Sequence, residues 1–138
     1  MRFHYSDGWS VTLEGEDGLE NQSLFIAEGM CEGRIGGRMR GANHPRRRVD
    51  RTFVTDFHGV IETDDGATVL FEAVGYGRAY PVGRRQIVSS LMHVSDHADY
   101  RWLNDVVCVG TGEVRTLPGN DVELVLDVAQ LVFDSMED

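Results

Sequence analysis

The chain has 138 residues, of which 41% are hydrophobic and 26% charged, and its formal net charge at pH 7 is -10. This length suits a single domain spanning residues 1–138, and no apolar run approaches the roughly 18 residues that a membrane-spanning helix needs. The negative charge disfavours nucleic acid, because the phosphate backbone is itself anionic. The composition therefore predicts a soluble globular domain with neither nucleic acid nor membrane as a partner.

The N-terminal region and the cysteines bear on location. Residues 1–18 contain no basic region followed by an apolar stretch, so we expect no secretory signal and a cytoplasmic location. The 2 cysteines, Cys31 and Cys108, lie far apart and have no partners at metal-ligand spacing. Reduced packing thiols are the favoured interpretation, with a redox or nucleophilic role as the alternative.

Turn sequences rich in Gly, Asp and Asn recur along the chain and divide it into short strands. The predicted strands are 9–14, 23–29, 34–41, 52–63, 68–78, 85–94, 106–114 and 122–133. Only residues 96–105 are expected to form a short helical turn. The absence of a helical period between strands favours antiparallel hairpins over βαβ units. A sheet of about eight strands avoids exposed edges best by closing into a barrel, whose interior is either filled by side chains or holds one small ligand.

A basic segment interrupts this acidic chain early. It holds seven of the 13 basic residues between positions 34 and 51, where Asp50 is the only acidic residue. The segment can recruit an anionic small molecule or an acidic partner. Alternatively, it is an exposed loop whose arginines pair with nearby carboxylates. Within it, Arg38 is predicted to bind ligand.

The stretch from Thr55 to Ala73 predicts a hairpin with polar residues on one strand face. Asp56, His58 and Glu62 share a face, because side chains two positions apart in a strand point the same way. If that face lines the interior, His58 and Asp56 form an acid–base pair, and Glu72 and Tyr76 on the next strand contribute to ligand binding. The alternative is that these groups lie on the outer face and pair across strands.

The register of this hairpin decides which residues face each other. With the turn at residues 64–66, residue numbers that sum to about 131 should lie opposite one another. This places Glu62 near Val69, and His58 near Ala73 or the adjacent Glu72 and Val74. A slip of one residue would exchange the two faces of the strand.

The last predicted strand, 122–133, is apolar on both faces. An isolated barrel has a wet outer wall, so a strand that is apolar on both faces indicates packing against another segment or subunit. We therefore expect a homodimer.

Three motifs occur in a fixed order: GMCEGRIGGRMRG, then DFHGVIETDDGATVLFEAVGYG, then YRWLNDVVCVGTGEV. In this order and spacing the chain resembles the DUF3237 family, also called UPF0311, over roughly residues 25–133. The resemblance implies an antiparallel β-barrel like those of lipocalins and allene oxide cyclases. The biochemical role of that family is largely unassigned, so the resemblance informs the fold more than the function.

Individual positions match or depart from the family pattern. Trp102 and Asn104 fall on its WLN motif, and both are predicted to bind ligand at one end of a pocket, although Asn104 can equally cap a turn. His58 stands where the pattern usually has Arg, and His93 replaces a usual aromatic residue. A histidine in place of arginine exchanges a permanent cation for a group that titrates near neutral pH.

Other site classes find little support. His93 and His97 have the spacing of helical metal ligands but lie in a predicted strand end and loop, so we predict no metal site and no cofactor. The sequence predicts a barrel that binds a small apolar or aromatic molecule. An acid–base enzyme of the cyclase or isomerase type, using His58 and Asp56, is one form of this prediction. The alternative is a noncatalytic carrier, or an interaction protein with a filled barrel.

Overall fold

The computed structural model describes residues 1–78 and 85–136. Its elements are β1 Arg2–Gly15, β2 Gly18–Cys31, β3 Gly37–Asn43, β4 Arg46–Arg47, β5 Phe53–Thr63, β6 Thr68–Arg78, β7 Gln86–Val94, the 3-10 helix η1 Arg101–Asp105, β8 Cys108–Thr116 and β9 Val122–Gln130. Within the described ranges, no helix combines the length and apolar character needed to cross a membrane.

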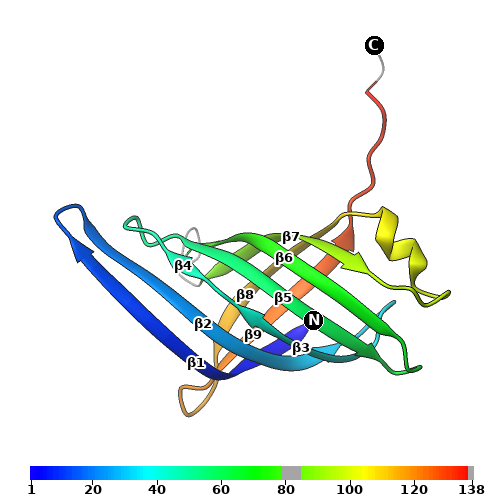
Figure 1. Ribbon diagram of the computed structural model, residues 1–138, viewed down its shortest axis with the longest axis horizontal. Helices are drawn as coiled ribbons and strands as arrows, with labels where there is room; N and C mark the ends of the chain where they lie inside the picture. The colour runs from blue at the N-terminus through cyan, green and yellow to red at the C-terminus, as the bar shows by residue number, and fades with distance from the viewer. Residues whose placement is uncertain (79–84, 137–138) are drawn as a thin grey trace.

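The strands form one closed antiparallel barrel, as the sequence predicted (Figure 1). The ring runs β1-β9-β8-β7-β6-β5-β3-β2, and β2 pairs again with β1; the short β4 bridges β2 and β5. The outer halves of β1 and β2 project as a hairpin beyond the barrel on the side of β4, which we call the β4 end. The opposite opening carries η1 and the β5–β6 turn, and we call it the η1 end (Figure 1).

Alternation of side chains fills the barrel interior. On β6, Val69, Phe71 and Ala73 are buried, whereas Leu70 and Glu72 between them are exposed. The same alternation holds along β7, because successive side chains of a strand point to opposite faces of the sheet. A closed ring thus gives each strand one dry face and one wet face.

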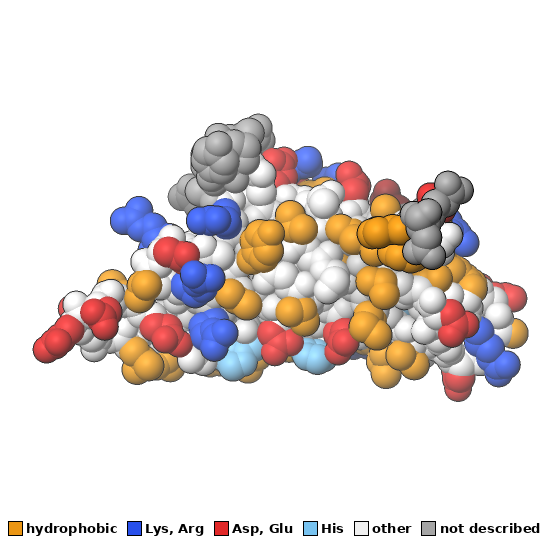
Figure 2. All heavy atoms as spheres, turned by 90° about the horizontal axis from the view of Figure 1, so that it is seen from above, with side chains coloured by type: hydrophobic (Ala, Val, Ile, Leu, Met, Phe, Trp, Pro, Cys, Tyr) orange, Lys and Arg blue, Asp and Glu red, His pale blue; other side chains and the backbone are white. Residues whose placement is uncertain are grey.

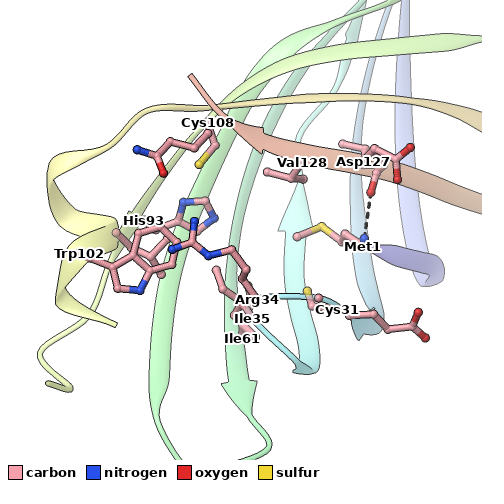
Figure 3. A pocket seen from close by; sticks show the side chains of 15 residues that line it. Met1, Cys31, Arg34, Ile35, Ile61, His93, Trp102, Cys108, Asp127 and Val128 are labelled. Carbon is pink, nitrogen blue, oxygen red and sulfur yellow. Dashed lines mark hydrogen bonds between the residues drawn. The ribbon is translucent and has the colours of Figure 1, made fainter. Parts of the chain in front are cut away.

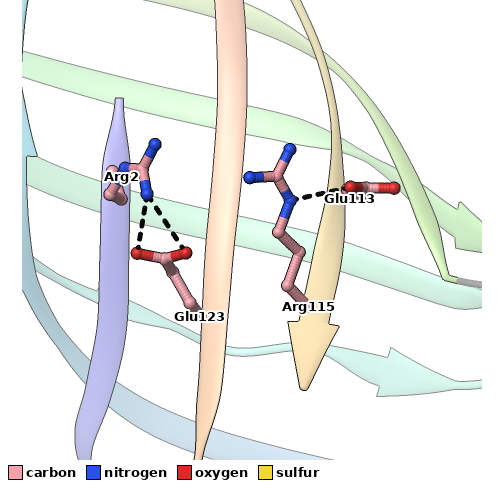
Figure 4. A network of polar contacts seen from close by, with 4 residues as sticks. All are labelled: Arg2, Glu113, Arg115 and Glu123. Carbon is pink, nitrogen blue, oxygen red and sulfur yellow. Dashed lines mark hydrogen bonds and ion pairs between the residues drawn. The ribbon is translucent and has the colours of Figure 1, made fainter. Parts of the chain in front are cut away.

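A short seam between β1 and β9 closes the ring. Arg2 pairs with Val125 and Phe3 with Leu124, and the Leu126 amide donates a 2.9 Å hydrogen bond to the Met1 carbonyl. On the outer face of the seam, Arg2 Nη1 lies 3.3 Å from a Glu123 carboxylate oxygen (Figure 4). Because this ion pair is exposed, its stabilisation is small, about 0–1 kcal/mol. Closure therefore depends on the backbone pairing and on the inward packing of Phe3 and Leu124.

The predicted hairpin is present, but its register differs from the prediction by one residue. Glu62 pairs with Thr68 rather than Val69, and His58 pairs with Glu72. The turn contains three residues between Thr63 and Ala67, and the Thr63 amide donates to the Ala67 carbonyl at 2.9 Å. A loop of odd length makes the paired residue numbers sum to an even value, so the estimate was wrong by one.

The C-terminal strand ends earlier than predicted, at Gln130. Leu124 and Leu126 are buried, but residues 131–133 lie beyond the strand and are exposed. Large apolar side chains also lie exposed on β6 and β7, and Figure 2 shows hydrophobic groups spread over one outer face between charged ones. The expected homodimer stays a prediction.

Close strand contacts in the barrel wall lead to a test. A Cβ on Gly75 would lie 1.9 Å from the Val88 carbonyl oxygen, whereas a Cβ on Gly15 would have only the Gly18 oxygen nearby, at 4.0 Å. Gly75→Ala should lower the free energy of unfolding by about 3 kcal/mol, because backbone rather than a movable side chain fills the space. Gly15→Ala should change it by less than about 0.5 kcal/mol. Urea unfolding of both variants measures this, and equal stabilities would contradict the wall geometry.

Candidate functional site

A cavity of about 280 Å³ opens at the η1 end of the barrel (Figure 3). Its lining comes from the β2–β3 connection, β7, η1, β8 and β9. Its titratable or aromatic side chains are Cys31, Glu32, Arg34, His93, Trp102, Cys108 and Asp127. The volume equals that of roughly nine water molecules at about 30 Å³ each, so the cavity can hold a small organic molecule.

The end of β7 places His93 in this cavity. Ile87, Ser89, Leu91 and His93 occupy successive inward positions of β7, and all are buried. His93 is the inward position nearest the η1 end, where the interior opens into the cavity. A strand whose inner face is otherwise apolar or small therefore ends with an imidazole inside the barrel.

A hydrogen-bonded clamp holds η1 over the opening. The Ser95 amide donates to Asn104 Oδ1 at 2.8 Å, and Asn104 Nδ2 donates to the Ser95 carbonyl at 2.9 Å. Leu103 is buried beneath η1, and this packing leaves Trp102 half-buried at the cavity mouth. Asn104 thus fastens the helix to the segment after β7 through both its carbonyl oxygen and its amino group. Trp102 is the predicted ligand residue that lines the cavity.

His93 is buried, with 5% of its surface exposed, and its buried ring nitrogen Nδ1 makes no hydrogen bond to any part of the chain that the structure describes. Burial lowers the pKa of His93 below its ordinary value. The ring is therefore neutral at pH 7 and offers one donor and one acceptor nitrogen. Buried polar groups are nearly always hydrogen-bonded, so the ring can accept a partner that the described residues do not supply.

The remaining cavity walls combine thiols with a cationic rim. Burial raises the pKa of both Cys31 and Cys108, which keeps these free thiols protonated. They act as small apolar wall groups rather than nucleophiles, which confirms the predicted reduced thiols. At the rim, the Arg34 guanidinium lies 4.0 Å from the centre of the Trp102 ring (Figure 3). This cation–π contact orients the indole across the mouth.

The predicted acid–base pair lies elsewhere. His58 Nε2 is 3.0 Å from Asp56 Oδ1, but both side chains are on the outer wall, with 66% and 54% of their surfaces exposed. Phe57 and Ile61 take the inward positions of β5, so their even-numbered neighbours must point outward. The interior location that an acid–base role required is therefore wrong, and we do not assign catalysis to His58 and Asp56.

Three other predicted ligand residues share the outer wall. Glu72 lies opposite His58, and Tyr76 is exposed four residues further along β6. Arg38 Nη2 lies 3.5 Å from a Glu28 carboxylate oxygen on the neighbouring strand. The outer face was the alternative that the sequence left open for the hairpin residues, and Glu72 and Tyr76 lie there.

Sequence reasoning missed His93 and Arg34 as site residues. The apolar positions Ile87 and Leu91 lie four residues apart on β7, and this period extended by two identifies His93 as inward. No comparable pattern identifies Arg34, because it lies in the connection between β2 and β3. Among residues 1–78 and 85–136, no three His, Cys, Asp or Glu side chains are placed to hold a metal ion.

Comparisons with known proteins support the fold but do not identify a reaction or a ligand. No family model matches the chain, and no curated protein matches it. The chain is similar to a β-barrel-like protein of Acinetobacter baumannii AYE (TM-score 0.67, 19% identity, covering 94% of this chain and 89% of that one). It is also similar to a conserved protein of unknown function from Rhodopseudomonas palustris (TM-score 0.69, 21% identity, 95% and 92% covered). A third similar structure is an enzyme from Penicillium herquei (TM-score 0.56, 20% identity, 93% and 90% covered).

The buried imidazole predicts a pH dependence of stability. The unfolded chain protonates His93 near its ordinary pKa of about 6.5, whereas burial lowers the pKa in the folded state. Between the two values the unfolded state binds more protons, so the free energy of unfolding falls as pH falls below about 6.5. His93→Phe should lose less stability than the wild type between pH 7.5 and pH 5.5, as measured by urea unfolding.

A control on the same strand separates this effect from general core damage. Leu91→Met changes a buried neighbour that does not titrate, so it should shift stability equally at both pH values. An acid-side loss of stability in His93→Phe equal to that of the wild type would contradict the neutral buried imidazole.

Proposed function

We propose that the protein binds a small, largely apolar or aromatic molecule in the η1-end cavity, where the neutral imidazole of His93 makes a hydrogen bond with a polar group of that molecule. The observation that carries this proposal is the buried ring of His93, which has no hydrogen-bonding partner within the described chain. A buried imidazole nitrogen without a hydrogen bond costs folding free energy unless another molecule supplies the bond. A bound ligand or water supplies that partner.

The walls define the class of ligand. Ile61, Leu103, Trp102 and the two protonated thiols give a mostly apolar lining, which suits one or two rings. The volume of about 280 Å³ is just below the ~300–1,000 Å³ range typical of sites for drug-sized molecules. A neutral ligand with a single hydroxyl or carbonyl group therefore fits better than a large or highly charged one.

The resemblance to the DUF3237 family supports a lumenal ligand through its lipocalin-like barrel, and membership in that family is part of this proposal. The similar structure from Penicillium herquei is described as an enzyme. At 20% identity the likeness extends to the fold only. The case for binding at the η1 end accordingly depends on the cavity itself.

The first test uses 2-naphthol, a neutral fused-ring phenol whose hydroxyl can donate to an imidazole. The chain has 2 tryptophans, Trp102 at the cavity mouth and Trp9 exposed on the projecting hairpin. In an NMR titration the indole N–H signal of Trp102 should shift while that of Trp9 stays constant. His93→Phe should weaken binding about fivefold, which corresponds to one hydrogen bond of about 1 kcal/mol.

The outer-wall variant His58→Gln provides the matched control and should bind 2-naphthol as the wild type does. Unchanged affinity in His93→Phe, or a shift of Trp9 instead of Trp102, would refute the η1-end site.

Acid–base catalysis at His93 is the second candidate, and the lowered pKa of its imidazole favours it. A neutral imidazole in a cavity can accept a proton from carbon and return it, as an isomerase or cyclase requires. If this is the activity, the wild type in D₂O should speed hydrogen–deuterium exchange at the α carbon of 1-indanone at least about tenfold over His93→Phe. Equal exchange rates in both proteins would exclude catalysis by His93, and a noncatalytic carrier would then be the function.

A further inference from the structure

The β4 end of the barrel holds a second, larger cavity of about 490 Å³. Its lining combines apolar side chains of β2, β5, β7, β8 and β9 with a small set of polar groups. The polar groups relevant here are Tyr5, Asn43, Thr55 and Arg85. Nothing in the η1-end cavity uses these residues.

An aromatic plug separates the two cavities. The ring centres of Phe3 and Phe57 are 5.5 Å apart, and those of Phe57 and Phe71 are also 5.5 Å apart. The space left around these rings is about 40 Å³, little more than the volume of one water molecule of about 30 Å³. An organic ligand at one end therefore does not reach the other, and the two cavities are independent.

A hydrogen-bond chain fixes the direction of the Tyr5 hydroxyl. The Asp56 amide N–H donates to Asn43 Oδ1 at 3.2 Å, so the other side of the Asn43 amide must be the donor. Asn43 Nδ2 in turn donates to the Tyr5 hydroxyl oxygen at 2.8 Å. Tyr5 then has its own hydroxyl hydrogen left, and no acceptor for it is found among the described residues. Burial raises the pKa of Tyr5, so this hydrogen is retained at neutral pH.

Thr55 adds a second hydroxyl without a partner. Its Oγ1 is buried and makes no hydrogen bond to a described residue, although buried hydroxyl groups nearly always have a partner. Thr55 lines the same cavity as Tyr5. The cavity thus contains two hydroxyl donors for which the described residues supply no acceptor.

Arg85 supplies the charge. Its guanidinium lies 3.9 Å from the centre of the Phe53 ring, and its Cγ and Cδ lie 3.4 Å from the position that a Cβ on Gly77 would take. In the part of the chain that the structure describes, no carboxylate forms an ion pair with Arg85. It is also the only charged residue among the described residues that line this cavity. A chain with a net charge of -10 therefore keeps every described carboxylate out of this lining.

We propose that the β4-end cavity is a binding site for a small organic acid, whose carboxylate accepts hydrogen bonds from Arg85, Tyr5 and Thr55. A carboxylate offers two oxygens and about four acceptor positions, which matches a set of unpaired donors around one cation. Phe25, Phe53 and Leu124 give the remaining wall an apolar surface for the body of the acid. This site is distinct from the η1-end cavity and does not depend on the function proposed there.

The test compares 2-naphthoate with 2-naphthalenemethanol, which keeps the rings and replaces the carboxylate with a neutral alcohol. In an NMR titration of the full chain, 2-naphthoate should shift the signals of Tyr5, Thr55 and Arg85 and leave those of Trp102 unchanged. The alcohol should bind at least about tenfold more weakly at this end, because it lacks the charge-assisted hydrogen bonds.

Variants separate the two ends of the barrel. Arg85→Gln should weaken 2-naphthoate binding at least about tenfold. Thr55→Val, which keeps the side-chain shape, should weaken it about fivefold. Arg34→Gln, at the η1 end, is the matched control and should leave 2-naphthoate binding unchanged while its own contact with Trp102 is lost.

Three results would overturn the proposal: no 2-naphthoate binding at millimolar concentration, equal affinity for acid and alcohol, or an Arg85→Gln affinity within twofold of the wild type. Thr55→Val keeps the inference testable if Arg85→Gln does not fold. The shift of Trp102 with 2-naphthol is measured on the same sample, so failure at one end is distinguishable from failure at the other.

Discussion

The pairing of β1 with β9 is the contact on which both cavities depend. Only the first residues of β1 take part, where Phe3 lies beside Leu124, and the rest of β1 pairs with β2 alone and leaves the barrel. Without this seam the sheet would have two free edges and no enclosed interior. The seam also brings Phe3 inward against Phe57, so the contact that closes the ring also builds the plug between the cavities.

Once the ring is closed, the side of the wall decides the chemistry of a residue. His58 and His93 are the same residue type on strands of one sheet, but His58 is exposed beside Asp56, whereas His93 is buried and its Nδ1 has no partner among the described residues. Water screens the exposed ion pair and reduces it to a small surface contribution. The buried imidazole is held neutral by desolvation and can make a hydrogen bond in a medium where such a bond is stronger.

Much of the fold could be predicted from the sequence, because its signals are local. Strand β6 has the predicted bounds Thr68–Arg78, and the Asp64–Gly66 turn joins it to β5 as expected. Alternation of apolar residues and turn chemistry act over a few positions and need no knowledge of the rest of the chain. The length of this turn also determines the register of the hairpin. The predicted register was wrong by one residue because the turn contains three residues, which makes the paired residue numbers sum to an even value.

The site was harder to predict because cavities arise from distant segments. Phe57 and Ile61 already indicate which face of β5 is inward, and greater weight on them would have placed His58 outside. No local pattern reveals that loop residue Arg34 meets Trp102, or that Arg85 meets Phe53, since each pair joins different parts of the ring. The volume left at each end depends on how side chains from many strands fill the interior, which sequence periodicity does not determine.

The state of the His93 ring tests the account most directly. A long-range ¹H–¹⁵N NMR spectrum of the histidine side chains at pH 7 reports whether each ring is protonated and which nitrogen carries the hydrogen. The account predicts a neutral His93 ring in one tautomer, with a ring nitrogen whose shift changes when 2-naphthol binds. A protonated His93 at pH 7, or a ring whose nitrogens do not respond while the probe binds, would contradict it.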